Sequence, residues 1–186
     1  MATLIYVTNV SLDGFIEDEH GNFDWTQPDD EQFAFITELV RPVGTYLYGR
    51  RLYEAMAVWE TDPALAADSE LRADFAHVWQ AADKVVYSTT LDAVSTARTR
   101  IERRFDPDAI GRIKDTATAD LTVGGATFAA SAFHAGLVDE IHLFVAPVVI
   151  GRGKPSLPHD LRMELELLDE RRFDNGIVYL RHRVLA

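Results

Sequence analysis

The sequence predicts a three-layer α/β/α domain whose sheet is mixed, mostly parallel, and closed by an antiparallel C-terminal hairpin. Short apolar segments alternate with amphipathic ones through most of the chain, as strands do with covering helices. The two final apolar segments flank Asn175-Gly176, a strong signal for a hairpin turn. Since the 186 residues contain no linker, repeat or low-complexity segment, we expect a single domain over residues 1–186.

The N-terminal elements follow from local composition. Residues 3–12 are apolar and β-branched, as in a buried strand, whereas the acidic, glycine-containing residues 13–25 indicate a long loop. Residues 28–40 begin with a proline and place apolar side chains at helical spacing, so we expect a helix there. Residues 44–49 read as a short strand closed by glycine, and residues 50–59 continue as a helix.

The middle of the chain repeats this alternation. Residues 64–83 have apolar side chains on one helical face, which predicts one long helix, and the β-branched residues 84–89 predict a strand. Residues 98–105 alternate weakly and favour another strand. Residues 107–116 follow as a predicted helix with an interior glycine.

The C-terminal elements begin with a strand at 120–125 and a helix at 126–136 that ends on glycine. Residues 139–151 are a long apolar segment, which predicts a strand and could serve a homodimer interface as well as the core. Because Pro147 cannot donate to a strand ladder, we expect a bulge or a sheet edge there. The last predicted elements are a loop at 152–160 and a closing hairpin at 163–185.

Composition excludes several classes of function. The net charge is −12, and residues 1–40 hold nine acidic residues but no Lys or Arg, so nucleic-acid binding through a broad basic face is not expected. The chain lacks cysteine, which removes thiolate chemistry and Cys-ligated zinc, and its six histidines are scattered, so no metal site is expected. No segment predicts a membrane span or a secretory signal, and we expect a cytoplasmic protein.

Two predicted strand-to-helix junctions stand out, "YLYGRRLYEAM" at 46–56 and "LTVGGATFAAS" at 121–131. Glycine allows close approach of a backbone or ligand, and the first amides of a helix attract anions, so such junctions can hold phosphates. A tight turn without a ligand explains the glycine pair equally well. Between the junctions, "VYSTTL" ends a strand in three hydroxyl residues, which with Arg50 and Arg51 would suit a ribose 2′-phosphate.

The order of four segments resembles the dihydrofolate reductase-like fold. These segments are "SLDGFIE" (11–17), "WTQPDD" (25–30), "GRRLYE" (49–54), and "VGGATF" with "LVDEIHLFVAPVVIGRGKP" (123–155). The last segment and "SLDG" are most similar to the branch that contains the C-terminal reductase domain of the bifunctional riboflavin-pathway deaminase-reductase. The resemblance covers essentially the whole chain, as a stand-alone member of that branch.

The resemblance implies NADPH binding. The loop at 13–16, with Phe15 and Ile16, would close over the nicotinamide. The other implied cofactor contacts are, by segment, Gly49, Arg50 and Arg51 at the adenosine phosphates, Ser88, Thr89 and Thr90 at the 2′-phosphate, and Gly124, Gly125, Ala126 and Thr127 at the pyrophosphate.

Two carboxylates are candidates for moving the proton that accompanies hydride transfer. Dihydrofolate reductases place an acid five residues after a loop tryptophan on a helix opened by proline, and Trp25 and Asp30 reproduce that spacing. Desolvation beside Trp25 and Phe33, the expected substrate-binding residues, would let a carboxylic acid hold a proton. Asp13 is the second candidate, because it opens the same loop. The structural alternatives are a first-turn helix acid for Asp30 and a turn-forming residue for Asp13.

The chain also departs from the dihydrofolate reductase pattern. Leu52 stands where those enzymes usually carry a threonine that faces the cofactor, and no arginine is evident to hold a folate tail. Arg152 and Lys154 are placed to meet a substrate phosphate, or simply lie in a solvated loop. We therefore expect an NADPH-dependent reductase of a small heterocyclic or carbonyl substrate, pteridine-like or a ribosylaminopyrimidine. The alternative is a non-catalytic, dimeric nucleotide-binding module that retains the fold.

Overall fold

The computed structural model describes residues 1–185 and has an eight-stranded sheet in the order β5-β4-β3-β6-β1-β7-β10-β9. A second sheet of two strands pairs β2 with β8. The strands are β1 (Leu4–Ser11), β2 (Phe15–Asp18), β3 (Val43–Gly49), β4 (Asp83–Tyr87), β5 (Thr99–Glu102), β6 (Asp120–Gly124), β7 (Glu140–Ala146), β8 (Gly153–Pro155), β9 (Glu164–Arg172) and β10 (Val178–Leu185). The helices are η1 (Asp24–Thr26), α1 (Asp30–Val40), α2 (Arg50–Met56), α3 (Val58–Thr61), α4 (Pro63–Ala67), α5 (Glu70–Ala81), α6 (Pro107–Thr116) and α7 (Ala126–His134).

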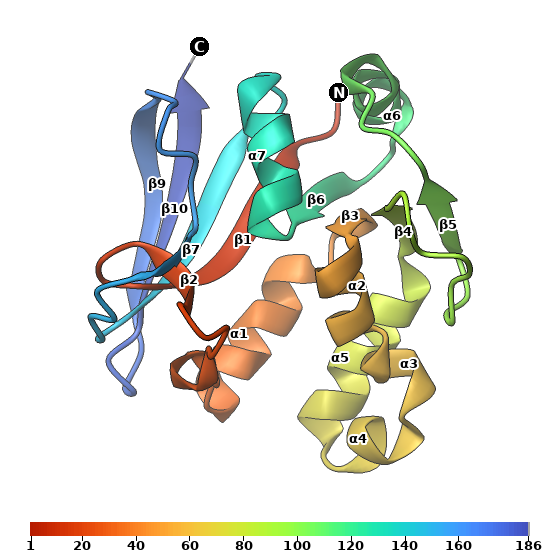
Figure 1. Cartoon of the computed structure of the whole chain (residues 1–186). Coiled ribbons are helices and arrows are strands. Elements are labelled where there is room, and N and C mark those ends of the chain that lie inside the picture. The colour runs from red at the N-terminus through yellow and green to blue at the C-terminus, as the bar shows by residue number, and fades with distance from the viewer. Residues whose placement is uncertain (186) are drawn as a thin grey trace.

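The three layers are those expected from the sequence. Helices α6 and α7 lie on one face of the large sheet, and α1 with α2–α5 lies on the other (Figure 1). The six strands from β5 to β7 in the sheet order are parallel, and β10 and β9 complete the sheet as an antiparallel hairpin. The fold class is thereby confirmed. Within residues 1–185, none of the helices is long and apolar enough to cross a bilayer.

Strand β1 lies at the centre of the sheet between β6 and β7. Leu4 is paired with Leu121 of β6, and Ile5 is paired with Glu140 of β7. The side chains of β1 alternate between the layers, as a buried strand requires. Leu4 and Tyr6 pack in the core beneath α7, whereas Val7 packs with side chains of α1. The central strand therefore contributes to the cores on both faces of the sheet.

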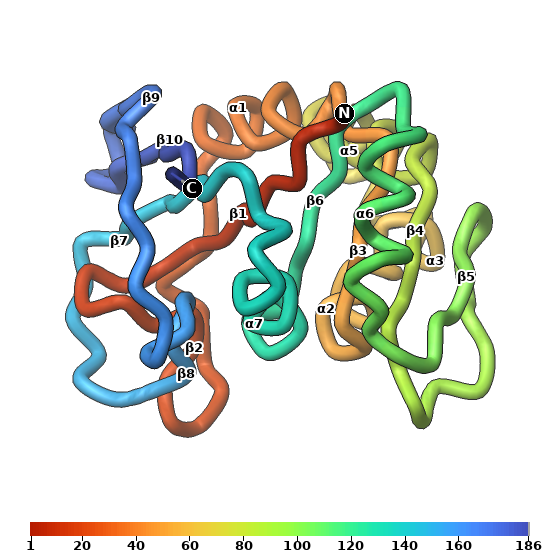
Figure 2. The backbone as a smooth tube through the Cα atoms, turned by 90° about the horizontal axis from the view of Figure 1, so that it is seen from above, coloured from red at the N-terminus to blue at the C-terminus, as the bar shows by residue number. Residues whose placement is uncertain are grey.

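The predicted loops 13–25 and 152–160 contain strands that sequence periodicity missed. Strand β2 from the first loop pairs with β8 from the second, and this small ribbon lies at the same end of the molecule as the starts of α2 and α7 (Figure 2). Gly153 is required there, because a methyl group at this position would lie 3.0 Å from Cα of Asp18. The hydroxyl of Tyr6 donates to the carbonyl of Ser156 at 2.7 Å and fixes the ribbon to β1.

The predicted helices 50–59 and 64–83 are each interrupted. The first divides into α2 and α3 at Ala57. The second divides into α4 and α5, because the Ser69 side chain accepts a hydrogen bond from the amide of Arg72 and so caps a new helix. The apolar face of α5 nevertheless packs as expected, and Trp79 is fully buried in the core below the sheet.

The predicted strand 139–151 ends at Ala146, directly before Pro147, so the proline lies outside the strand rather than in a bulge within it. Strand β7 is an interior strand between β1 and β10, and its apolar side chains belong to the core. It is therefore not a free surface for a dimer. The exposed large apolar side chains of the adjoining hairpin are Leu165, Leu167 and Leu185. Homodimer formation stays a prediction.

Candidate functional site

Two helices begin side by side at the carboxyl ends of β3 and β6. Tyr48 and Gly124 are paired across these neighbouring strands, so the residues that follow them also meet. Gly125 has φ = +87°, and a methyl group on it would lie 3.7 Å from the amide nitrogen of Gly49. The positive φ favours glycine, and the short distance shows that the two strand-to-helix junctions are in contact. The two predicted strand-to-helix junctions, 46–56 and 121–131, therefore lie side by side at one edge of the sheet.

The start of α7 offers free backbone amides. Gly125 is its N-cap residue, and within residues 1–185 no side chain caps the helix there. Ala126 and Thr127 form its first turn, where unpaired N–H groups and the helix dipole favour a negative charge. The arrangement can hold a phosphate group.

Arg50 joins this junction to the hydroxyl residues after β4. Its Nη1 donates to Thr90 Oγ1 at 2.9 Å, and its Nε donates to Glu54 at 2.8 Å. Ser88 Oγ accepts from the amides of Thr90 and Leu91, at 3.3 and 3.0 Å, and holds the loop in a tight turn. Arg50, Ser88 and Thr90 thus lie together as the sequence predicted, and Thr89 is exposed at the tip of the same turn.

A second cation, Arg103, supports this turn and was not singled out from the sequence. Its Nη1 donates to the carbonyls of Ser88 and Leu91, at 3.1 and 2.7 Å. The available signal was the cluster of arginines in 98–104, which follows the hydroxyl segment in the chain. Two guanidinium groups therefore border the hydroxyl turn.

Arg51 does not join Arg50 at the hydroxyl turn, contrary to the paired arrangement expected. Its side chain is 84% exposed and points toward the β2–β8 ribbon, where its nearest acid is Glu17 at 3.9 Å. Lys154 of β8 lies at the same distance from Glu17 on the other side. Arg51 and Lys154 thus share one carboxylate partner.

Asp13 is held by hydrogen bonds, as its structural alternative of a turn-forming residue would require, and its role in proton transfer stays a prediction. Its carboxylate accepts from Ser11 Oγ at 2.7 Å and from the amides of Ile150 and Gly151 at 3.2 and 2.7 Å. The Ser11 hydrogen bond, with these amides, holds the pKa of Asp13 below its usual value despite some desolvation. The residue therefore stays ionised and ties the start of the ribbon to the segment after β7.

Phe15 and Ile16 belong to strand β2 rather than to an irregular loop. Both are half-buried, and Phe15 is paired with Pro155 in the ribbon. The amide of Ser156 also donates to the carbonyl of Gly14 at 3.0 Å. The segment expected to close over a nicotinamide is thus held by its pairing with strand β8.

The expected desolvated acid at Asp30 is absent. Asp30 is the first residue of α1, lies exposed, and forms no side-chain hydrogen bond or ion pair with another residue in 1–185. Its neighbour Asp29 is the N-cap, accepting from the amide of Gln32 at 2.8 Å. The spacing between Trp25 and Asp30 correctly predicted that Asp30 lies on helix α1, but it could not predict that the side chain is exposed. A proton role for Asp30 stays a prediction without the proposed desolvation.

Trp25 and Phe33 were expected to bind the substrate together, but their side chains pack in different clusters. Trp25 packs in the cluster around Phe144, and its indole N–H is buried without a partner among the described residues. Phe33 packs against Trp59 and Phe75, with ring centroids 5.8 and 5.4 Å apart. The two aromatic side chains lie in separate clusters on either side of α1.

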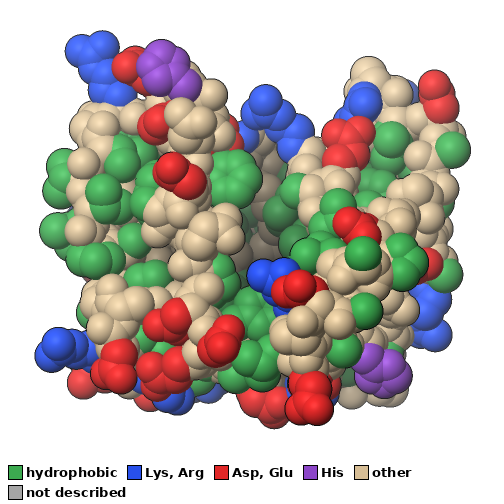
Figure 3. Space-filling view, turned by 90° about the horizontal axis from the view of Figure 1, so that it is seen from below, with side chains coloured by type: hydrophobic (Ala, Val, Ile, Leu, Met, Phe, Trp, Pro, Cys, Tyr) green, Lys and Arg blue, Asp and Glu red, His purple; other side chains and the backbone are tan. Residues whose placement is uncertain are grey.

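A cleft of about 220 Å³ lies between α1 and α2, over β1, β3 and β6. Figure 3 looks onto this layer and shows the surface hollowed between two raised halves. Leu52, at the position where dihydrofolate reductases usually carry threonine, lines the cleft beside Gly124. The full lining is Val7, Thr8, Asn9, Ile36, Val40, Tyr46, Tyr48, Leu52, Met56, Phe75, Thr122, Val123, Gly124 and Phe144.

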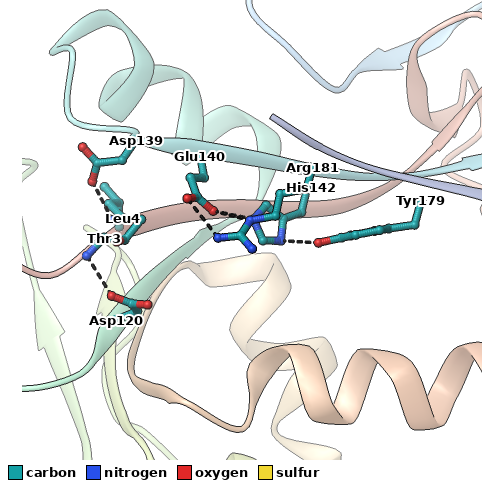
Figure 4. Close-up of polar contacts among 8 residues, drawn as sticks. All are labelled: Thr3, Leu4, Asp120, Asp139, Glu140, His142, Tyr179 and Arg181. Carbon is teal, nitrogen blue, oxygen red and sulfur yellow. Dashed lines mark hydrogen bonds and ion pairs between the residues drawn. The ribbon is translucent and has the colours of Figure 1, made fainter. Parts of the chain in front are cut away.

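A largely buried polar network connects β7 and β10 and consists of Glu140, His142, Tyr179 and Arg181 (Figure 4). Arg181 binds the carboxylate of Glu140 through two hydrogen bonds of 2.8 and 3.1 Å, and His142 Nε2 lies 3.0 Å from the same carboxylate. Tyr179 donates or accepts at His142 Nδ1, also at 3.0 Å. Its ring contacts Phe144 with centroids 5.0 Å apart, and Phe144 forms part of the cleft wall.

Fold and site together define a dihydrofolate reductase-like domain with an open cleft at the carboxyl ends of its central strands. The family model described as the RibD C-terminal domain matches residues 2–179. The chain therefore belongs to the RibD C-terminal domain family, as the sequence resemblance indicated.

The relatives agree with this assignment. The protein YyaP of Bacillus subtilis (strain 168), which is named as uncharacterized, is 28% identical over 173 residues, covering 92% of this chain and 89% of that protein. A protein of Shewanella sp. PV-4 whose provisional name refers to riboflavin biosynthesis has a similar structure, with a TM-score of 0.76, 18% identity and full coverage of both chains.

Two further solved structures show the same fold. A pyrimidine reductase-like protein of Corynebacterium diphtheriae has a TM-score of 0.66 at 13% identity, and the match covers all of this chain and 92% of that one. The deaminase/5-amino-6-(5-phosphoribosylamino)uracil reductase of Thermotoga maritima has a TM-score of 0.63 at 14% identity. The match covers 99% of this chain but 57% of the Thermotoga protein, so this chain spans little more than half of that protein.

Proposed function

We propose that the protein is an NADPH-dependent reductase that transfers hydride to a small heterocyclic or carbonyl substrate. The observation that carries the proposal is the junction of α2 and α7, where Gly49 and Gly125 bring two helix starts together beside Arg50 and Thr90. A dinucleotide needs two phosphate-binding positions at neighbouring strand ends, and this junction supplies them. The names of two structurally similar proteins, from Corynebacterium diphtheriae and Thermotoga maritima, contain the word reductase and support the proposal.

The residues present fit this cofactor. A side chain at Gly125 would strain the positive-φ backbone (φ = +87°) that precedes the first amides of α7, the groups proposed to bind the pyrophosphate. Ala126 and Thr127 would bind the pyrophosphate with backbone amides, and Arg50 with the turn at Ser88 and Thr90 would bind the 2′-phosphate. When bound, the cofactor supplies the hydride. The chain itself orients the reacting ring against the cleft and excludes water with Leu52 and Met56.

One observation favours the second candidate, a nucleotide-binding module without catalysis. Within the described residues, no Asp, Glu, His, Lys or Arg side chain lines the cleft, and Asp30 is exposed to solvent. A reductase with this cleft takes its proton from solvent or from Asp30 through water. Turnover by Asp30→Asn, compared with wild type on one accepted substrate, separates these routes.

A thermal-shift titration tests cofactor binding. NADPH at about 100 times its dissociation constant stabilises a protein by about 2.7 kcal/mol, so wild type should show a clear shift and a smaller one with NADH. Gly125→Ala should abolish the NADPH shift. Gly136→Ala is the matched control, because Gly136 also has positive φ, +64°, but lies at the other end of α7. A normal NADPH shift in Gly125→Ala, or none in wild type, would contradict the proposal.

A further inference from the structure

Two polar groups in the cleft lack the partners that buried polar groups normally have. Tyr46 is only 4% exposed, and its hydroxyl has no hydrogen-bond partner within residues 1–185. The Oδ1 atom of half-buried Asn9 is likewise buried and unpaired among the described residues. Both side chains line the cleft. Because an unpaired buried polar group costs stability, such groups in a native protein call for an explanation, and a ligand supplies one.

We propose that Asn9 is the specificity-determining residue of this cleft, and that it selects a small uncharged ring with adjacent N–H and C=O groups, that is, a cyclic amide. This inference rests on the proposed reductase function and narrows its substrate class. It also separates the substrate from phosphorylated ribosylaminopyrimidines, the kind of compound that the name of the Thermotoga protein gives.

The choice of a cyclic amide as the ligand follows from the hydrogen-bonding groups of the Asn9 side chain. An asparagine side chain presents one acceptor and one donor group next to each other, and the complementary partner is a ring edge with a neighbouring N–H and C=O. In the sheet, Asn9 of β1 is paired with Phe144 of β7, and both line the cleft. Phe144 is 1% exposed and supplies an apolar aromatic surface beside the amide. A flat ring can therefore pack on the wall while its edge binds Asn9.

That the proposed ligand is uncharged follows from the residues that line the cleft. A charged group would lose its hydration in this cleft without meeting any Lys, Arg, His, Asp or Glu side chain of residues 1–185. Arg51 and Lys154, on α2 and β8, do not line the cleft and are each 3.9 Å from the carboxylate of Glu17. The lining therefore favours an uncharged ring over one that carries a charged phosphate into the cleft.

Calorimetric titration with three matched probes tests the proposal. The probes are lumazine, a neutral bicyclic ring with cyclic-amide edges; 1,3-dimethyllumazine, which lacks the N–H donors; and 6-carboxylumazine, which adds a charge. Each is titrated into wild type and Asn9→Leu, with and without saturating NADPH. We expect wild type to bind lumazine at least about tenfold more tightly than either analogue, and Asn9→Leu to lose this preference.

Two controls keep the outcomes separate. The melting temperature of Asn9→Leu should be no lower than that of wild type, because leucine replaces an unpaired amide in an apolar cleft. Asn9→Asp, which keeps the shape but adds a charge, should also lose lumazine binding. Equal binding of lumazine and 1,3-dimethyllumazine, full binding by Asn9→Leu, or no lumazine binding by wild type would overturn the inference. Failure of NADPH to bind, with the lumazine preference intact, would count only against the reductase function.

Discussion

Two neighbouring groups of polar side chains on the α1 side of the sheet differ in how their hydrogen bonds are satisfied. In the network of Glu140, His142, Tyr179 and Arg181, each member has a partner at 2.8 to 3.1 Å. In the cleft, on the other side of Phe144, Asn9 Oδ1 and the Tyr46 hydroxyl have none among residues 1–185. The network is fully hydrogen-bonded, whereas the cleft leaves polar atoms without a protein partner, and this difference is the basis of the proposed ligand site.

The largest expected effect comes from breaking the network. Glu140→Ala removes the carboxylate that both Arg181 and His142 contact, and leaves His142 buried with one nitrogen unpaired. We expect a loss of about 2–3 kcal/mol in the free energy of unfolding, below the usual cost of a broken buried pair because Arg181 is partly exposed. Urea denaturation measures this loss.

The matched control for that prediction is Glu166→Ala. Glu166 pairs with Arg183 at 2.7 Å, but both side chains are about half exposed, so the expected loss is under about 1 kcal/mol. Equal losses for Glu140→Ala and Glu166→Ala would show that burial of the network contributes nothing.

A smaller expected effect is the dependence of network stability on pH. Burial lowers the pKa of His142, and the Glu140 carboxylate offsets this only in part. Burial acts to raise the pKa of Glu140, but hydrogen bonds from Arg181 and His142 outweigh it and the pKa is lowered. Both groups bind protons more readily in the unfolded chain. Their stabilisation is therefore full above about pH 6.5 and is lost as pH falls.

Urea denaturation of wild type and His142→Gln at pH 7.5 and pH 5.5 checks this sign. Wild type should lose more stability than the variant over this interval. His134, whose pKa is raised by the carbonyl of Ala130 and by Asp160, acts in the opposite direction, but it is the same in both proteins. A wild-type loss no larger than that of His142→Gln would contradict a buried neutral imidazole.

The smallest expected effects compare two tyrosines directly. Tyr179→Phe should cost about 1 kcal/mol, because it leaves His142 Nδ1 without its partner. Tyr46→Phe should change the free energy of unfolding by less than about 0.5 kcal/mol or raise it, because the hydroxyl it removes is unpaired. Denaturation midpoints of the two variants test the contrast. If Tyr46→Phe costs as much as Tyr179→Phe, the cleft hydroxyl has a structural partner.

The order of strands and helices could be predicted because it depends on local periodicity. The paired glycine junctions and the contact between Arg50 and Thr90 could also be anticipated, since the carboxyl ends of parallel strands meet at one sheet edge. The β2–β8 ribbon could not, because it joins segments of four and three residues that are far apart in the chain. Such short pairings leave no repeating pattern in either segment.

The exposure of Asp30 and the burial of Asn9 Oδ1 were equally hidden from sequence. Spacing places a residue on an element, but burial depends on which elements cover it. The interruption of the helix at 64–83 did have a signal, since Ser69 after Asp68 is a typical N-cap and was outweighed by the apolar periodicity.

The central position of β1 has a consequence for synthesis of the chain. Its partners, such as Leu121 and Glu140, are made more than a hundred residues later. At about 5–20 residues per second, the apolar segment "LIYVTNVS" waits roughly 7–27 seconds before both neighbours have been synthesised. The nascent chain therefore carries an unpaired strand, Leu4–Ser11, through most of translation.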